Sequence, residues 1–251
     1  MKIKNITKQN NGKYKLKLED NSTIITYDAV IINNNILYNK DADKDLINEE
    51  NKFYDIYNDV LKYASGKNHS EKEIKEYLDK FNLDSKKNGE IINKLKNIGV
   101  INDNYYVKAY IHDRLMFSSD GPAKIKKALV KSGVDSYIID EELDKMDTLF
   151  SEKCEKIVLK KINGNKKYPI NVLKRKVIGE MELLGFNNIN IDKYISCMDN
   201  SDVLKLEFDK LYRKYSLKYK EDELNNILFK KLYNKGFNKD EIWNLMKKNN
   251  F

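Results

Sequence analysis

The stretch GPAKIKKALVKSG, residues 121–133, contains the pattern that decides the fold. Ile125 and Leu129 are four residues apart, which places both side chains on one face of a helix. Pro122 suits the first turn of that helix, because no N–H is needed there. Gly133 can adopt the left-handed conformation that ends a helix. The stretch therefore predicts a short amphipathic helix between a sharp turn and a glycine cap.

The same pattern recurs along the chain at a nearly constant spacing. The four segments are Ile74-x3-Leu78-x3-Asn82, Ile125-x3-Leu129-x3-Gly133, Val177-x3-Met181-x3-Gly185 and Leu228-x3-Leu232-x3-Gly236. Their closing residues are 51, 52 and 51 positions apart. Further apolar residues follow each closing residue: Ile92, Ile139 with Leu143, Ile191 with Ile195, and Ile242 with Met246. This period exceeds those of helical-hairpin repeats, about 34 residues, and of armadillo repeats, about 40–47 residues.

A period of this length, with two short helices after a longer one, predicts a three-helix repeat. One such unit buries too little apolar surface alone, so the units are expected to stack into an elongated array. We expect about four repeats, at residues 53–101, 102–146, 147–200 and 201–251. The alternative is an ordinary helical bundle with a chance similarity among its segments. The chain has only two prolines and ten glycines, which favours a mainly α fold because turn-rich sheets draw on both residues.

The first fifty residues follow a different pattern. Tyr14, Leu16 and Leu18 alternate with lysines, which is the period of a half-buried strand. Residues 19–22 predict a turn, residues 23–27 a returning strand, and residues 3–6 a third strand. Residues 28–50 combine a short apolar run with a polar link. We expect a small antiparallel sheet within residues 1–50 that packs on the following helices, since it is too small to be stable alone.

Several classes of protein are disfavoured by the composition. No run of about 18 apolar residues is present to span a membrane, and the N-terminus lacks the apolar core of a secretory signal. Cys154 and Cys197 are far apart and are expected to be small buried residues. His69 and His112 have no neighbouring residues arranged for catalysis. We therefore expect a cytoplasmic, monomeric protein that is not an enzyme and has no metal or cofactor.

The net charge of +8 is concentrated in one part of the chain. Residues 1–65 carry ten basic and ten acidic side chains, whereas residues 153–178 carry nine basic side chains and the single acid Glu155. Arginine, the usual residue for gripping phosphate, is scarce: only Arg114, Arg175 and Arg213 are present. The overall basicity is thus weak evidence for a nucleic-acid partner, and residues 153–178 are where such contacts are most expected.

Three segments together resemble the RecX family of recombination regulators. They are Ser70-Glu71-Lys72-Glu73-Ile74-x3-Leu78, then Gly99-Val100-Ile101-Asn102-Asp103-Asn104-Tyr105-Tyr106-Val107-x2-Tyr110-Ile111-x2-Arg114, then Gly121-Pro122-x2-Ile125-x3-Leu129-x3-Gly133-Val134. The N-terminal sheet also resembles the extension of longer family members. The chain departs from the family pattern at Asn82, Asn102 and Val107.

The resemblance implies a regulator of homologous recombination and the SOS response. Such a protein binds in the groove of a RecA filament on single-stranded DNA and inhibits RecA ATPase, strand-exchange and coprotease activity. Direct contact with DNA phosphates is also considered. Two alternatives remain open: a helical-repeat protein that binds single-stranded nucleic acid directly, and a scaffold for another acidic protein.

The predicted site residues form two groups. Candidate contacts with the partner or with DNA are Arg114, Lys124, Lys127, Lys131, Lys153, Lys156, Lys160, Lys161, Lys166, Lys167, Lys174, Arg175 and Lys176. Structural residues of the motifs are Ser70, Glu73, Asp103, Tyr106, Tyr110, Gly121, Pro122, Ile125, Leu129 and Gly133. Ser70 and Glu73 are expected to form a capping box, and Asp103 to cap its own helix. Solvated lysine faces are the simplest alternative for the first group.

Overall fold

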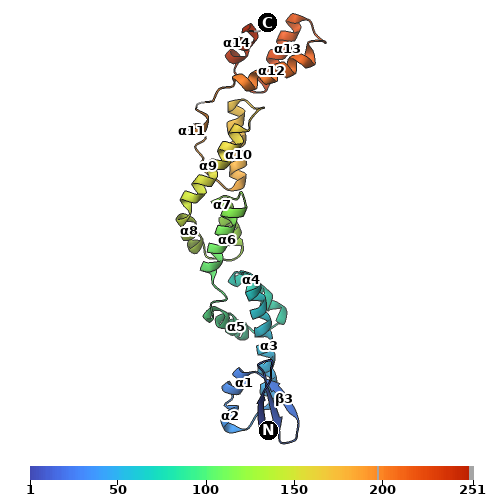
Figure 1. Cartoon of the computed structure of the whole chain (residues 1–251), viewed down its shortest axis with the longest axis vertical. Helices are drawn as coiled ribbons and strands as arrows, with labels where there is room; N and C mark the ends of the chain where they lie inside the picture. The colour runs from blue at the N-terminus through green and yellow to red at the C-terminus, as the bar shows by residue number, and fades with distance from the viewer. Residues whose placement is uncertain (197, 249–251) are drawn as a thin grey trace. The chain divides into compact units, whose positions relative to one another are not determined.

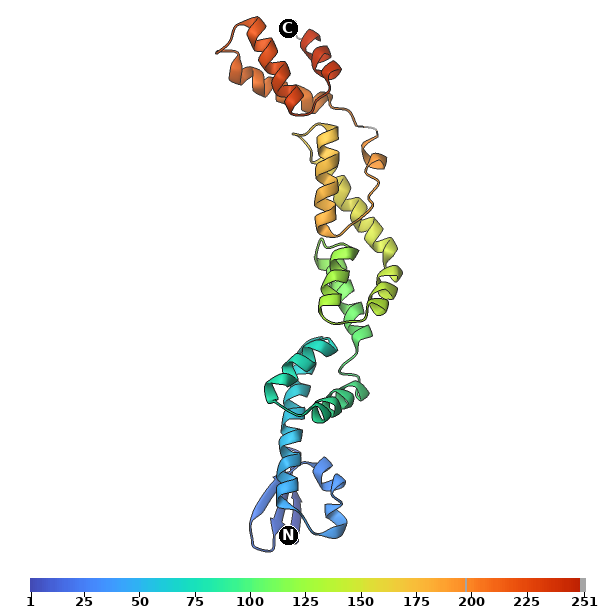
Figure 2. The same ribbon diagram turned by 180° about the vertical axis from the view of Figure 1, so that it is seen from behind.

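A computed structural model describes residues 1–196 and 198–248, so Cys197 and the last three residues lie outside it. The described chain divides into two compact units (Figures 1 and 2). Unit 1 comprises residues 1–106 and 132–134, and unit 2 comprises residues 107–131 and 135–248 of the described chain. Among the described residues the strands are confined to the N-terminus, and the remainder is helical.

The N-terminal sheet has three antiparallel strands, β1 (Ile3–Lys8), β2 (Tyr14–Leu18) and β3 (Thr23–Thr26), in the order β1-β2-β3. Leu16 pairs with Ile6 on one side and with Ile24 on the other, and its side chain is fully buried. The inward residues of the sheet share one core with the following helices. The predicted sheet and its packing are therefore confirmed.

Unit 1 also contains helices α1 (Asp28–Asn33), α2 (Ile36–Asn39), α3 (Lys44–Gly66), α4 (Glu71–Leu78) and α5 (Ser85–Asn97), with a 3-10 turn at Asp79–Phe81. The predicted polar link is wrong over its second half, because α3 begins at Lys44 and not near Phe53. The Asp43 side chain accepts hydrogen bonds from the amides of Asp45 and Leu46, which fixes this earlier start.

The next helices are α6 (Asp103–Phe117), α7 (Pro122–Lys131), α8 (Ser136–Lys145), α9 (Asp147–Asn163), α10 (Ile170–Leu184) and α11 (Asp192–Ile195). The last three are α12 (Ser201–Tyr215), α13 (Glu221–Asn234) and α14 (Lys239–Lys248). Four sets of three helices follow one another over the described residues: α3–α5, α6–α8, α9–α11 and α12–α14. We refer to them as the first to fourth repeats, and to α4, α7, α10 and α13 as their central helices.

The closing residues of the repeat pattern all adopt the predicted left-handed backbone. The φ angles are 51° at Asn82, 81° at Gly133, 90° at Gly185 and 97° at Gly236. The apolar pairs before them, from Ile74 and Leu78 to Leu228 and Leu232, are buried. The predicted mainly α fold with three-helix repeats is confirmed.

The closing glycines also form the junctions between successive repeats. A Cβ atom added to Gly133 would lie 2.6 Å from the Lys72 side chain, at the start of α4 in unit 1. In unit 2, a Cβ at Gly185 would lie 2.5 Å from the Lys124 amide nitrogen of α7, and one at Gly236 would lie 2.8 Å from Val172 of α10. Within unit 2, the ends of α10 and α13 thus abut the first turns of α7 and α10.

The start of a central helix is capped in two cases by the repeat that follows it. The Glu71 amide of α4 donates to the Asp103 carboxylate at 3.0 Å, and the Ile170 amide of α10 donates to the Asn200 side chain at 2.9 Å. Pro122 occupies the same position in α7, where it has no N–H to satisfy. The predicted role of Asp103 is corrected here: Asn102 caps α6 through the Tyr105 amide, and Asp103 caps α4.

Candidate functional site

The basic stretch at residues 153–178 folds into the helical hairpin α9–α10. The side chain of Asn165 organises the turn between the two helices. Its Oδ1 atom accepts a hydrogen bond from the Tyr168 amide at 2.9 Å, and its Nδ2 atom donates one to the Tyr168 carbonyl at 2.7 Å. Pro169 is buried at the N-cap of α10. The turn therefore holds Lys166 and Lys167 in solvent at a fixed place.

The ring of Tyr168 lies close to two lysine ammonium groups. The Nζ atom of Lys167 is 5.3 Å from the ring centroid, and that of Lys176 is 4.8 Å from it. Lys156, Lys160, Lys166 and Arg175 are exposed on the same hairpin and form no ion pair with other described residues. We call Tyr168 with these six basic residues the α9–α10 basic patch. The sequence places Tyr168 beside Lys166 and Lys167, but the proximity of Lys176 to its ring is visible only in the structure.

Three of the predicted basic contacts are instead engaged within unit 2. Lys161 pairs with Glu180, and Lys174 pairs with Asp192. The Lys153 ammonium donates to the carbonyls of Arg114 at 2.9 Å and Leu115 at 3.0 Å, at the end of α6. Burial lowers the pKa of Lys153. Lys153 is thus a half-buried cap for the negative end of α6, and its ammonium is engaged by backbone carbonyls.

Asp120 binds the basic residues that flank the turn between α6 and α7. Its carboxylate lies 2.6 Å from the Lys124 ammonium and 3.8 Å from the Arg114 guanidinium. Arg114 also stacks over the ring of Tyr110, with 5.0 Å from the guanidinium carbon to the ring centroid. Lys127 and Lys131 are exposed on α7. Arg114 and Lys124 therefore meet an internal acid, while the exposed part of α7 remains basic.

Asp120→Asn is expected to make unit 2 less stable by less than about 1 kcal/mol at neutral pH, because the ion pairs are partly open to solvent. The hydrogen bond from Lys124 holds the pKa of Asp120 below its ordinary value of 3.8. When the pKa of a carboxyl is lower in the native than in the unfolded protein, its ionisation adds to the free energy of unfolding. This contribution is complete above the unfolded-state pKa and is lost as the pH falls to the native-state pKa.

Urea unfolding of both proteins between about pH 3 and pH 7 measures this effect. The difference in unfolding free energy is expected to be constant above about pH 5 and to shrink below about pH 4. A difference that grows on acidification would contradict the assignment.

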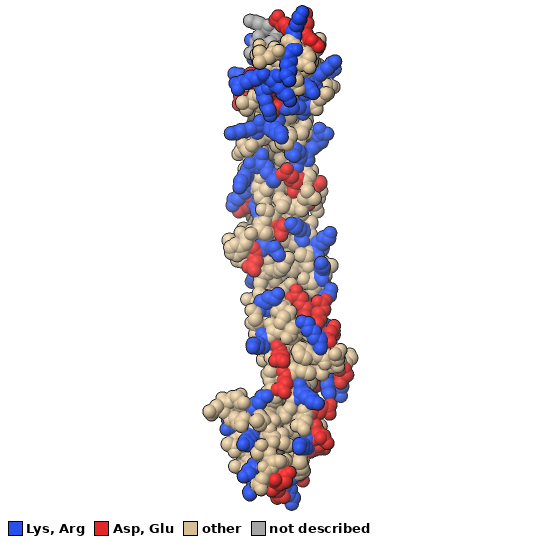
Figure 3. Space-filling view, turned by 90° about the vertical axis from the view of Figure 1, so that its right-hand side faces the viewer, with Lys and Arg blue, Asp and Glu red and all other residues tan. Residues whose placement is uncertain are grey.

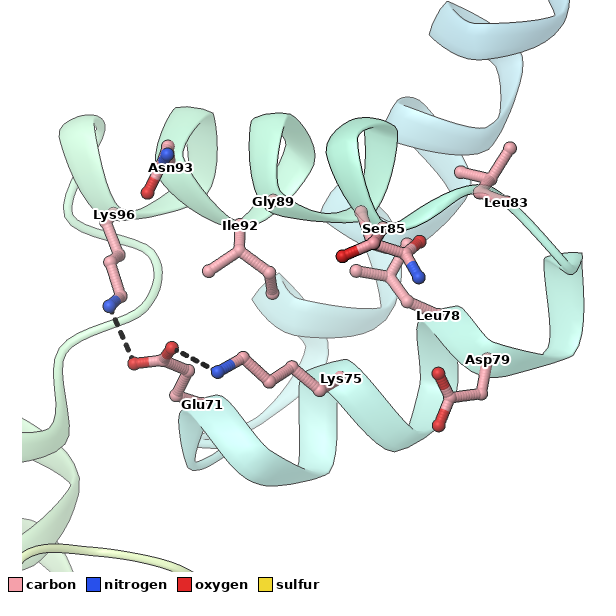
Figure 4. Close-up of a pocket in the computed structure, with 11 residues that line it drawn as sticks. Glu71, Lys75, Leu78, Asp79, Leu83, Ser85, Gly89, Ile92, Asn93 and Lys96 are labelled. Atoms are coloured by element: carbon pink, nitrogen blue, oxygen red, sulfur yellow. Dashed lines mark ion pairs between the residues drawn. The ribbon is translucent and has the colours of Figure 1, made fainter.

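A groove in unit 1 lies between α4 and α5 and encloses about 570 Å³. Figure 4 shows Leu78 and Ile92 at its apolar floor and Glu71 between two lysines. The Glu71 carboxylate lies 2.8 Å from the Lys75 ammonium and 2.7 Å from that of Lys96. These three charges satisfy one another, and Asp103 caps the Glu71 amide. Asn88 also lines the groove, and its side-chain oxygen is buried without a hydrogen-bond partner.

The motif residues around this groove hold the first junction together. Ser70 and Glu73 form the capping box of α4, and the Ser70 hydroxyl donates to the Ser132 carbonyl at 2.8 Å. Tyr106 is buried, with its hydroxyl 3.4 Å from that of Ser132. In unit 2, the Gly121 amide donates to the Leu184 carbonyl at 2.6 Å, where a side chain would clash with Gly185.

The described part of the chain comprises residues 1–196 and 198–248. In that part of the chain, no group of three His, Cys, Asp or Glu side chains is arranged to hold a metal ion. None of the described helices combines the length and apolar character that crossing a membrane requires. Cys154 is half-buried, and burial raises the pKa of its thiol.

Known proteins share these features. A family model described as the second three-helix domain of RecX matches residues 102–143. The regulatory protein RecX of Streptococcus agalactiae is 33% identical over 193 residues, covering 72% of this chain and 73% of that relative. The regulatory protein RecX of Streptococcus gordonii is 28% identical over 258 residues, covering 98% of this chain and 99% of that relative.

A crystal structure of regulatory protein RecX has the same fold, with a TM-score of 0.68 at 21% identity, over 78% of this chain and 99% of that chain. The matched domain contains residues 102–114 of the second motif and all of the third motif, residues 121–134, and the alignment to the streptococcal relatives extends well beyond it. The chain belongs to the RecX family of regulatory proteins.

Proposed function

We propose that this protein binds the RecA filament on single-stranded DNA and inhibits its ATPase, strand-exchange and coprotease activities. It thereby limits homologous recombination and the SOS response. The observation that carries the proposal is membership of the RecX family, supported by the intact junction residues Ser70, Asp103 and Gly121. A set of joined repeats can contact a polymer at several places, and linked weak contacts bind more tightly together than separately.

The test uses the full chain with a RecA protein from the same organism. RecA's DNA-dependent ATPase rate and strand exchange are expected to fall at near-stoichiometric or lower ratios of the added protein. An absence of effect on both activities would overturn the proposal.

A matched pair of charge-reversal variants identifies the surface that is used. Changing Lys156, Lys160 and Arg175 of the α9–α10 basic patch to Glu is expected to weaken inhibition about tenfold, because these exposed charges face an acidic filament. The same change at exposed Lys4, Lys52 and Lys62 of unit 1 alters the net charge equally and is expected to have little effect. Equal losses in both variants would show that only the net charge matters.

One alternative is a scaffold for another acidic protein. It predicts no inhibition of RecA and no binding to the RecA filament. Sedimentation of the protein with RecA filaments distinguishes the two functions, since a scaffold for another protein would stay in the supernatant.

A further inference from the structure

The central helices of the third and fourth repeats start earlier than those of the first two. Helices α4 and α7 begin eleven residues before their closing residues, Asn82 and Gly133. Helices α10 and α13 begin fifteen residues before Gly185 and Gly236. Four residues are about one helical turn. Each of the last two repeats therefore has an added turn of helix, which carries the preceding loop outward.

Both of these loops carry a tyrosine directly after a lysine at the same place in the repeat. Tyr168 and Tyr219 each stand seventeen residues before their closing glycines, and each directly follows a lysine, Lys167 or Lys218. Tyr168 lies against Lys167 and Lys176, as described above. Tyr219 is 36% exposed and contacts Tyr215 at 6.1 Å between ring centroids. The Lys214 ammonium is 5.4 Å from the Tyr215 ring.

Within unit 2 these two loops project from the same side. They lie at the right of unit 2 in Figure 1 and at the left in Figure 2. Figure 3 looks onto that side, and blue Lys and Arg side chains are dense over its C-terminal helices with few acids between them. The acids Glu221, Asp222 and Glu223 begin α13 beside the second loop. The Tyr168 loop is therefore the more basic of the two.

We propose that the Tyr168 and Tyr219 loops bind single-stranded nucleic acid directly. The bases stack on the tyrosine rings, and the phosphates pair with Lys166, Lys167 and Lys176 at the first loop and with Lys218 at the second. Aromatic faces beside cationic groups are how proteins hold single strands without reading sequence. An acidic protein surface would use the lysines but has no need of a ring at the same position in two successive repeats. This contact goes beyond the proposed inhibition of RecA and does not require RecA.

The test measures binding of the full chain to a fluorescein-labelled oligothymidylate of about 30 nucleotides, without RecA. Tyr168→Ala is expected to weaken binding about tenfold and Tyr219→Ala by a smaller factor, because each loses a stacking surface. Tyr168→Phe keeps the ring and is expected to bind as the unchanged protein does. Tyr137→Ala is the matched control, since Tyr137 is 75% exposed on α8. Wild-type affinity in Tyr168→Ala would overturn the inference.

The lysines are tested through the salt dependence. Changing Lys166, Lys167 and Lys176 to Gln is expected to reduce the slope of log affinity against log salt by about 2, at about 0.7 per lost phosphate contact on a single strand. An unchanged slope would contradict the phosphate contacts. An oligouridylate of the same length shows whether DNA or RNA is preferred. Polyaspartate is the competitor that represents an acidic protein. If it displaces the oligonucleotide as well as unlabelled oligothymidylate does, and if Tyr168→Ala weakens its binding equally, the loops bind acidic proteins instead.

The RecA assays on the same proteins separate this inference from the proposed function. If the unchanged protein inhibits RecA but does not bind the oligonucleotide, the loops are not a nucleic-acid site and the proposed function stands. If it binds the oligonucleotide through Tyr168 but leaves RecA unaffected, the inference stands and the proposed function fails.

Discussion

Gly185→Ala is expected to destabilise unit 2 by about 2–5 kcal/mol, the sum of two separate costs. Gly185 has a φ of 90°, a conformation that L side chains rarely adopt. Its added Cβ would also lie 2.5 Å from the amide nitrogen of Lys124 and 2.6 Å from the Lys124 Cβ. These atoms belong to the first turn of α7, so relief requires the two repeats to move apart.

The comparison with the other glycines makes this prediction specific. At Gly133 the clash involves only side-chain atoms of Lys72, of which the Cδ at 2.6 Å can rotate away while the Cβ at 2.8 Å cannot. At Gly185 the clash includes backbone atoms of Lys124, so Gly133→Ala is expected to cost less than Gly185→Ala. Gly179 lies inside α10 with open space where a Cβ would stand. Gly179→Ala is expected to stabilise the same helix by up to about 1 kcal/mol, because alanine favours a helix more than glycine does.

Urea denaturation followed by far-ultraviolet circular dichroism measures all three variants. Equal stability of Gly185→Ala and Gly179→Ala would show that the junction is not as close as described. Because this junction joins the second and third repeats, Gly185→Ala is also expected to lower RecA inhibition, whereas Gly179→Ala is expected to leave it unchanged.

The repeat architecture was predictable because its determinants are local in sequence. A left-handed residue after two apolar residues four apart is visible without any tertiary contact, and Asn82, Gly133, Gly185 and Gly236 all close helices as predicted. The start of α3 was not predictable in the same way. Its first turns are rich in Asp, Asn and Glu, and only Ile47 is buried there. The amphipathic period is therefore too weak to detect before residue 53.

The candidate site was predictable as a region but not residue by residue. Charge counting found the α9–α10 hairpin, yet it could not separate exposed Lys156 from Lys153, whose acceptors lie 38 and 39 residues earlier in the chain. Asp103 presents the same difficulty, because the amide that it caps belongs to Glu71 in the preceding repeat. Such contacts depend on how repeats stack, and a periodic pattern alone does not specify them.

Tyr219 shows what a closer comparison of repeats could have found. Its equivalence to Tyr168 is visible once both residues are counted back from the closing glycines. The extra turn at the start of α10 and α13 is visible only in the structure. The structure also places the loops before these two helices on one side of unit 2.

Lys235→Met is expected to destabilise the fourth repeat by about 1–3 kcal/mol, because it leaves a buried carboxylate without its main partner. The expected loss is smaller than for a fully buried pair, since the Lys235 side chain is 37% exposed. Glu207 of α12 is buried, with its side chain only 6% exposed, and it pairs with Lys235 just after α13. Without Lys235 the nearest cation is Lys210, at 3.9 Å and 72% exposed. The Glu207 carboxylate would then be buried without adequate compensation.

The double variant Glu207→Leu with Lys235→Met tests this reason, because it removes both charges from the core of the fourth repeat. Its stability is expected to return to within about 1 kcal/mol of the unchanged protein, since apolar replacements of a buried pair are often neutral or stabilising. Lys126→Met is the matched control: Lys126 and Asp140 pair at 2.6 Å with side chains 42% and 48% exposed, so the loss is expected to stay below about 0.5 kcal/mol. Equal losses in Lys235→Met and Lys126→Met, measured by urea denaturation, would mean that burial of Glu207 has no energetic consequence. A full loss in the double variant would instead show that the ion pair itself stabilises the repeat.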